Sequence, residues 1–156
     1  MNWLSFLTWC SALGSGLIAG VFYAFSSFVM PALRQLPATQ GIAAMQAINR
    51  TALTPAFLGV FVGTAVASLA LGVLSFWGVA DGRSGLRWAG CAAYLVGSFG
   101  LTCACNVPRN EVLAQLDAAS ASAATYWQVY LSEWTAYNHV RALASLAALV
   151  LLVLAR

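Results

Sequence analysis

Four long apolar runs alternate with short polar stretches along this chain. The runs cover residues 3–30, 54–77, 86–105 and about 126–154. A helix needs about 20 mostly apolar residues to cross a hydrocarbon layer about 30 Å thick, whereas a transmembrane strand alternates polar and apolar residues over about 10 positions. Because these runs are continuous, they predict an all-α integral membrane protein. We expect a four-helix transmembrane bundle that forms a single domain over residues 1–156.

The stretch between the first two runs is too polar to cross a membrane but long enough for a short helix. Within it, Ile42, Met45 and Ile48 recur every three residues, which places one apolar stripe along a helix. We therefore expect a short amphipathic interfacial helix here, which either closes the bundle as a lid or packs across its mouth without gating. Pro31 is expected to end the first transmembrane helix, and Pro55 to begin the second.

Composition supports a membrane protein and narrows its partners. Hydrophobic residues make up 62% of the chain and charged residues only 7%, whereas about a quarter of the residues in soluble proteins are charged. The net charge of +3 is not concentrated in a polybasic cluster, so we expect the lipid bilayer and no nucleic acid as a partner. The first run is longer than the apolar core of a signal peptide and lacks a basic leader. We therefore expect it to remain in the mature protein.

An even number of spans puts both termini on the same side of the membrane, which we expect to be a bacterial inner membrane. Cytoplasmic loops are enriched in Lys and Arg, and this rule orients many membrane proteins. Here the arginines are divided almost equally between the two sides. We favour cytoplasmic termini because the arginines of the loop between the second and third runs lie close to span ends. Whether the protein forms a homo-oligomer remains open. The arginines at or beyond the ends of the spans divide into Arg34, Arg50 and Arg109 on one side and Arg83, Arg87 and Arg156 on the other.

The last apolar run cannot cross the membrane without polar residues. Residues 142–154 are only 13 in number and span about 20 Å as a helix. A crossing of about 20 residues therefore submerges Asn138, His139 and Arg141. Because an arginine at the bilayer centre costs roughly 2.5–3.5 kcal/mol, we expect these side chains to face the bundle or a wet cavity.

Helical spacing sorts this polar segment into two neighbouring stripes. One stripe carries Ser132, Thr135 and His139, and the other carries Trp134, Asn138 and Arg141. A structural interpretation is also open, in which Arg141 extends to the membrane surface, Trp134 is an interfacial anchor and His139 bonds to a neighbouring carbonyl.

A second polar segment, "NVPRN", follows the third run. Asn106 and Asn110 are one helical turn apart, and Pro108 between them predicts a kink or a helix end. Tyr23, near the end of the first run, is expected at the same level of the membrane. We therefore expect polar groups from three helices to converge in a site inside the bundle.

The cysteines do not predict a metal site. Cys10, Cys91, Cys103 and Cys105 fall within predicted spans and form no CxxC motif. We interpret them as packing residues, since a free thiol behaves as a small apolar group. A copper site is the alternative.

Three motifs together resemble the DUF1772 family, also described as anthrone oxygenase-like: "GVFYAFSSFVMPAL" in the first run, "NVPRN" after the third and "WTAYNHVRAL" in the fourth. The resemblance implies oxidation of an anthrone to an anthraquinone by dioxygen without an evident cofactor. The positions that carry it are Asn106, Pro108 and Asn110 in one motif and Trp134, Asn138, His139 and Arg141 in another.

Anthrone chemistry suggests a role for each of these residues. An anthrone has an acidic C–H beside a carbonyl, so a protein needs a base, an oxyanion stabiliser and an apolar slot. His139 is the candidate base because imidazole titrates near neutral pH. The candidate oxyanion stabilisers are Arg141, Asn138 and Asn110, and the other candidate substrate contacts are Asn106, Trp134, Tyr23 and Phe22.

Other functions remain open at this stage. A related phenol or quinone fits the same residues as well as an anthrone does. His139 alternatively ligates haem or a metal, or the slot holds a quinone in an electron-transfer subunit. A third possibility is a non-catalytic membrane protein whose polar face is an assembly surface.

Overall fold

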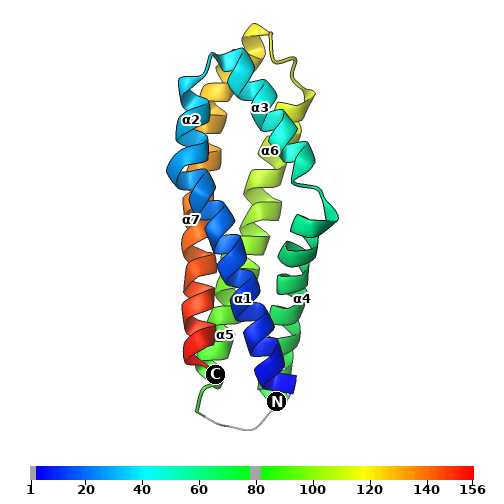
Figure 1. Cartoon of the computed structure of the whole chain (residues 1–156), viewed down its shortest axis with the longest axis vertical. Coiled ribbons are helices and arrows are strands. Elements are labelled where there is room, and N and C mark those ends of the chain that lie inside the picture. The colour runs from blue at the N-terminus through cyan, green and yellow to red at the C-terminus, as the bar shows by residue number, and fades with distance from the viewer. Residues whose placement is uncertain (1–2, 78–81) are drawn as a thin grey trace.

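The computed structural model describes residues 3–77 and 82–156, and in these residues it is helical without strands. Four helical segments are long and apolar enough to cross a membrane: Trp3–Gln35, Pro55–Trp77, Ser84–Gln115 and Ala121–Leu154. They lie side by side along the long axis, and both termini are at the same end (Figure 1). The predicted four-helix transmembrane bundle is thereby confirmed.

The first crossing is longer than predicted because Pro31 does not end it. Helix α1 (Trp3–Ala24) runs through a π-helical turn, η1 (Phe25–Val29), into α2 (Met30–Gln35). In this turn the N–H of Met30 donates to the carbonyl of Phe25, five residues back. A proline ring clashes with the carbonyl four residues before it, and a widened turn moves that carbonyl aside. The helix therefore continues past Pro31.

The third crossing shows the same behaviour at Pro108. It consists of α5 (Ser84–Ala92), two π-helical segments, η2 (Ala93–Gly100) and η3 (Thr102–Asn106), and α6 (Val107–Gln115). The N–H of Val107 donates to the carbonyl of Thr102, again five residues back. The crossing ends at Gln115 and not at the predicted residue 105. Asn106 and Asn110 consequently lie on one continuous, locally widened helix.

The predicted amphipathic helix is present as α3 (Ala38–Thr51). Ile42 and Met45 are buried against α2, α6 and α7, and Figure 1 shows α3 at the end of the bundle away from the termini. Gln46 donates to the carbonyls of Leu113 (2.8 Å) and Leu116 (2.9 Å), two acceptors at the C-terminal end of α6. Helix α3 thus closes the end of α6 with hydrogen bonds.

Helix α1 packs between the two remaining crossings, α4 (Pro55–Trp77) and α7 (Ala121–Leu154). A β-carbon added at Gly14 would lie 2.0 Å from Oγ1 of Thr64, so only glycine allows α1 to approach α4 this closely. An aromatic cluster that includes Phe22, Phe61 and Tyr94 fills the middle of the bundle. These contacts fix α1 beside the polar segment of α7.

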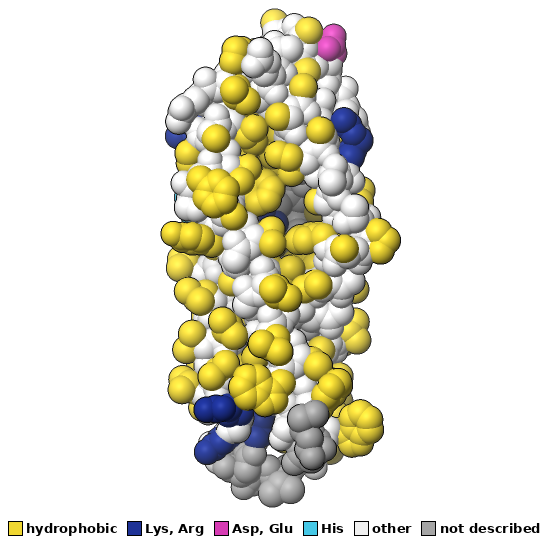
Figure 2. Space-filling view, in the orientation of Figure 1, with side chains coloured by type: hydrophobic (Ala, Val, Ile, Leu, Met, Phe, Trp, Pro, Cys, Tyr) yellow, Lys and Arg dark blue, Asp and Glu magenta, His cyan; other side chains and the backbone are white. Residues whose placement is uncertain are grey.

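The outside of the bundle is suited to lipid. Apolar side chains such as Leu17, Val66, Val96 and Leu143 are exposed along its length. Figure 2 shows yellow apolar side chains over the whole length of the visible face. Exposed tryptophans concentrate towards the end that holds the termini, as expected for an aromatic belt at a membrane–water interface. They are Trp3, Trp9, Trp77 and Trp88.

Candidate functional site

Arg141 is the centre of a buried polar cluster in the middle of α7. It lies 13 residues before the end of α7 at Leu154, which is about 20 Å along the helix axis, and its side chain is only 4% exposed. Its Nη2 donates to Oδ1 of Asn138 (2.6 Å) and its Nη1 to Oγ1 of Thr102 on η3 (3.1 Å). Both acceptors are neutral. Arg141 therefore lies inside the bundle and does not extend to the membrane surface.

Aromatic rings flank the guanidinium group of Arg141. Its central carbon lies 4.1 Å from the ring centroid of Phe22 on α1 and 5.0 Å from that of Trp134 on α7. A cation over an aromatic face is stabilised by the ring quadrupole, and more strongly where water is excluded. The two rings and the planar guanidinium form flat apolar walls around a positive charge.

Asn138 connects Arg141 to the first crossing. It is fully buried, and its Nδ2 donates both to the carbonyl of Phe22 (2.7 Å) and to Oγ of Ser26 (2.7 Å). Its Oδ1 accepts from Arg141, so both ends of the amide are bonded. Ser26 lies in the widened turn η1 before Pro31. The proline-induced turn thus meets the polar face of α7, in agreement with the frequent occurrence of π-turns at functional sites.

The two asparagines of the "NVPRN" segment hold Trp134 from both sides. Oδ1 of Asn110 accepts from Nε1 of Trp134 (2.8 Å) and from the hydroxyl of Tyr130 (2.7 Å). Nδ2 of Asn106 donates to the backbone carbonyl of Trp134 (3.1 Å). Trp134 is also stacked on Tyr130, with ring centroids 5.9 Å apart. These contacts fix the indole ring beside Arg141.

Two polar atoms of this cluster have no partner in the described residues. Nε of Arg141 and Oδ1 of Asn106 are buried and unbonded, one a donor and the other an acceptor. Buried polar groups are nearly always hydrogen-bonded, so these two atoms are available to bond water or a ligand. Figure 2 shows a hollow in the surface between α1 and the start of α4, in front of α6, with a basic side chain at its floor.

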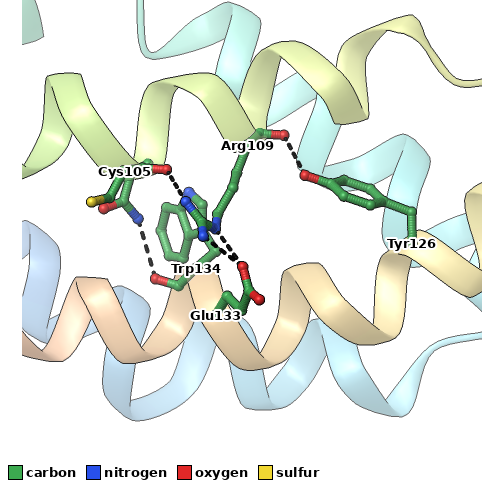
Figure 3. A network of polar contacts seen from close by, with 6 residues as sticks. Cys105, Arg109, Tyr126, Glu133 and Trp134 are labelled. Atoms are coloured by element: carbon green, nitrogen blue, oxygen red, sulfur yellow. Dashed lines mark hydrogen bonds and ion pairs between the residues drawn. The ribbon is translucent and has the colours of Figure 1, made fainter.

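A second arginine, Arg109 on α6, has the partners that Arg141 lacks. Nε and Nη2 of Arg109 donate to Oε2 of Glu133 (2.9 and 2.6 Å), and Nη1 donates to the carbonyl of Cys105 (2.8 Å). Its guanidinium also lies 4.6 Å from the ring centroid of Tyr137. Figure 3 shows Arg109 and Glu133 facing each other between α6 and α7. The charge of Arg109 is balanced within the protein.

The structure does not bring His139 or Tyr23 to this cluster. Both side chains are exposed on the outside of the bundle, Tyr23 by 67%. Successive helical residues differ by about 100°, so His139 faces outward while its neighbour Asn138 faces inward. Tyr23 is displaced in the same way from Phe22. The catalytic role predicted for His139 and the substrate contact predicted for Tyr23 therefore have no geometric support from the cluster.

The remaining predicted residues do converge, and comparison with known protein families now adds to the geometry. A family model described as anthrone oxygenase matches residues 56–151. The chain belongs to the anthrone oxygenase family. No curated protein and no solved structure matched the chain in the other two comparisons.

The family match covers most of the buried cluster but not all of it. The residues within it are Thr102, Asn106, Asn110, Tyr130, Trp134, Asn138 and Arg141. Phe22 and Ser26 belong to the first crossing, which lies outside the matched range. The first crossing nevertheless supplies one wall of the cluster and two acceptors for Asn138. In this member of the anthrone oxygenase family, the cluster is complete only when α1 is in place.

Thr102 and Tyr130 belong to the cluster but were not predicted from the sequence. Thr102 is four residues before Asn106, and Tyr130 is four residues before Trp134, so each lies on the same helical face as a predicted residue. Extending each predicted stripe by one turn identifies both. Within the described residues no group of three or more His, Cys, Asp or Glu side chains is arranged to hold a metal ion.

Proposed function

We propose that this chain is a membrane-embedded oxygenase that binds a flat phenol or anthrone-like ketone as its anion. The observation that carries the proposal is Arg141, a buried arginine with neutral partners and an unbonded Nε. Family membership supports the reaction class. In this proposal the substrate oxygen accepts from Arg141, and the ring system lies against Phe22 and Trp134.

The energetic argument concerns the charge of Arg141. A central arginine in a membrane costs roughly 2.5–3.5 kcal/mol, and a buried charge left without its partner costs about 3–5 kcal/mol. In the described residues no carboxylate bonds to Arg141. An anionic ligand supplies the missing charge. The cost of burying Arg141 then favours binding of the anion over the neutral ketone.

The proposed reaction balances with dioxygen as the only co-reactant. The anthrone loses its acidic proton to water, and the resulting carbanion forms a C–O bond to dioxygen, which after protonation is a hydroperoxide. Loss of the second proton from the same carbon and cleavage of the O–O bond give a carbonyl and water. The anion is electron-rich enough to react with dioxygen directly, so the proposal requires no cofactor. Preorganised charge at a developing oxyanion is often the largest contribution to catalysis.

The surroundings of Arg141 suit such a substrate. Flat aromatic ligands stack on aromatic rings such as those of Phe22 and Trp134. Apolar molecules also partition into the bilayer. The hollow in Figure 2 opens on the side of the bundle, so a substrate dissolved in the bilayer can enter it. The unbonded Oδ1 of Asn106 offers an acceptor for a phenolic hydroxyl. The cluster thus has a donor for an oxyanion, an acceptor for a hydroxyl and apolar walls.

Oxygen uptake by the purified chain in lipid vesicles tests the proposal. An anthrone is supplied as substrate, and the corresponding anthraquinone, which lacks the acidic C–H, is the control. We expect one dioxygen consumed per quinone formed, at a rate proportional to the amount of protein. Uptake equal to that of empty vesicles would refute an oxygenase. Binding of a quinone without uptake would instead indicate a quinone-binding subunit.

A further inference from the structure

A second basic site lies at the end of the bundle that holds the termini, far from Arg141. A cavity of about 340 Å³ is bordered there by the start of α1, the start of α5 and the end of α7. Its lining includes Arg83, Arg87 and Arg156, together with the hydroxyl side chains of Ser5 and Thr8. Small-ligand sites have volumes of about 300–1,000 Å³, so the cavity is large enough for a small polar group.

The charge of this end differs from that of the opposite end. Its three arginines are accompanied in the sequence by one acidic residue, Asp81, which lies outside the described residues, so the formal charge is positive. At the opposite end three arginines are matched by three acids. Basic side chains visibly gather at the lower end in Figure 2. At the opposite end, the three arginines are Arg34, Arg50 and Arg109, and the three acids are Glu111, Asp117 and Glu133.

Arg87 shows that the cavity is built into the bundle. Its side chain is only 4% exposed, while Arg83 and Arg156 are exposed at the rim. Helix α5 also begins here, with Arg83 as its N-cap residue. Helix N-termini present backbone N–H groups and a partial positive charge, both of which favour an anion.

Tryptophans near the cavity indicate that it lies at the level of lipid headgroups. Trp9 lies beside it, with the guanidinium of Arg156 5.6 Å from its ring centroid. Trp77 and Trp88 are exposed at the same end, and Trp88 donates to the carbonyl of Gly72. Tryptophan is enriched at membrane–water interfaces, where the phosphate groups of lipids also lie.

We propose that this cavity binds a phosphate group, with Arg83, Arg87 and Arg156 as its cationic contacts. Basic pockets between transmembrane helices hold anionic lipid headgroups, and arginine binds phosphate oxygens through its planar fork. The phosphate comes either from an anionic phospholipid in the surrounding leaflet or from free phosphate. The site is separate from the Arg141 cluster, so it is independent of the proposed oxygenase function.

Native mass spectrometry of the purified full chain in detergent tests this site. The probes are short-chain phosphatidylglycerol, short-chain phosphatidylcholine as a zwitterionic comparison, and inorganic phosphate as a competitor. The test variant combines Arg83→Gln with Arg156→Gln, and the control combines Arg34→Gln with Arg50→Gln at the opposite end. All four residues are exposed, so both variants are expected to fold.

We expect the wild type to prefer phosphatidylglycerol over phosphatidylcholine. Near an anionic surface each arginine contributes about a fivefold change in affinity, so the test variant should bind about 25-fold more weakly while the control is unchanged. Arg156→Gln alone should give about a fivefold loss. Displacement of the lipid by millimolar phosphate would support the site with free phosphate as its source. Equal affinity in the test and control variants, or no preference for the anionic lipid, would overturn the proposal.

Discussion

Two arginines on facing helices, Arg109 and Arg141, have opposite environments. Arg109 is 23% exposed and donates twice to the carboxylate of Glu133 and once to a backbone carbonyl. Arg141 is 4% exposed and donates to one amide and one hydroxyl oxygen. The more buried of the two therefore has the weaker set of partners.

The difference indicates what each arginine does. The charge of Arg109 is balanced by Glu133, so this pair stabilises the packing of α6 against α7 and the guanidinium is not available to bind a ligand. A charge buried without a counter-ion is costly, and proteins retain such groups in membranes mainly where they act on a ligand or an ion. We therefore propose a structural role for Arg109 and a functional role for Arg141.

The largest expected effect is that of Arg141→Gln on oxygen uptake. Removal of one oxyanion donor typically lowers kcat by about 10²–10³-fold. The Tm should stay the same or rise, because the substitution removes a buried charge without a counter-ion. Uptake rates and thermal unfolding of the same vesicle preparations measure both quantities. A large loss of Tm with little loss of rate would reverse the assignment of the two arginines.

A carboxylate placed beside Arg141 should make it resemble Arg109. Thr102→Asp puts an acid at the position of the hydroxyl that Arg141 now contacts, 3.1 Å away. The new carboxylate competes with an anionic substrate for the guanidinium, so we expect KM for the anthrone to rise at least about tenfold. Thr102→Asn is the neutral control of the same size. Equal KM values for the two variants would show that the charge of Arg141 does not bind the substrate.

Arg109→Gln should have the opposite profile to Arg141→Gln. Partly exposed ion pairs contribute about 0–1 kcal/mol, and the contact with Tyr137 adds a similar amount, so we expect a free energy of unfolding lower by about 1–2 kcal/mol. Oxygen uptake should remain within about twofold. Denaturant unfolding in detergent measures the first quantity. A loss of uptake as large as that of Arg141→Gln would place Arg109 in the site.

The smallest effect is expected for His139→Gln, because its side chain faces outward from the cluster. Oxygen uptake should stay within about twofold of the wild type at every pH between 5 and 8. General-base catalysis contributes about 10²–10⁴-fold, so a loss of that size, or of the acid limb of the pH profile, would show that the imidazole deprotonates the substrate.

The sequence allowed much of this structure to be predicted, but not the direction in which each polar stripe faces. Run lengths were sufficient for four crossings, and the short apolar tail of α7 indicated that Arg141 is submerged. Periodicity separated the stripe of His139 from that of Asn138 and Arg141. Because both stripes are polar, their sequences do not show which of the two packs against α1. That choice depends on contacts with Phe22 and Ser26, more than 100 residues away in sequence.

The prolines illustrate a second limit of sequence reasoning. Pro31 and Pro108 were expected to end or kink their helices, and Pro31 does not end its helix, because a π-turn accommodates its ring. Apart from the following proline, the local sequence carries no signal for this π-turn. The turn is stabilised by tertiary hydrogen bonds, such as that from Asn138 to Ser26, whose partners are far apart in the sequence.

The ionisation of a bound hydroxyanthraquinone tests most directly whether Arg141 stabilises an anion. The absorption spectrum of this product-like ligand changes when its hydroxyl ionises, so a pH titration gives the pKa of the ligand's hydroxyl in the free and bound states. An opposite charge within about 4–6 Å lowers a pKa by about 1–3, so binding to the wild type should lower the ligand's pKa by at least about 1. Arg141→Gln should abolish this change, while Arg109→Gln should preserve it. A ligand pKa that is unchanged or raised on binding to the wild type would contradict the role assigned to Arg141.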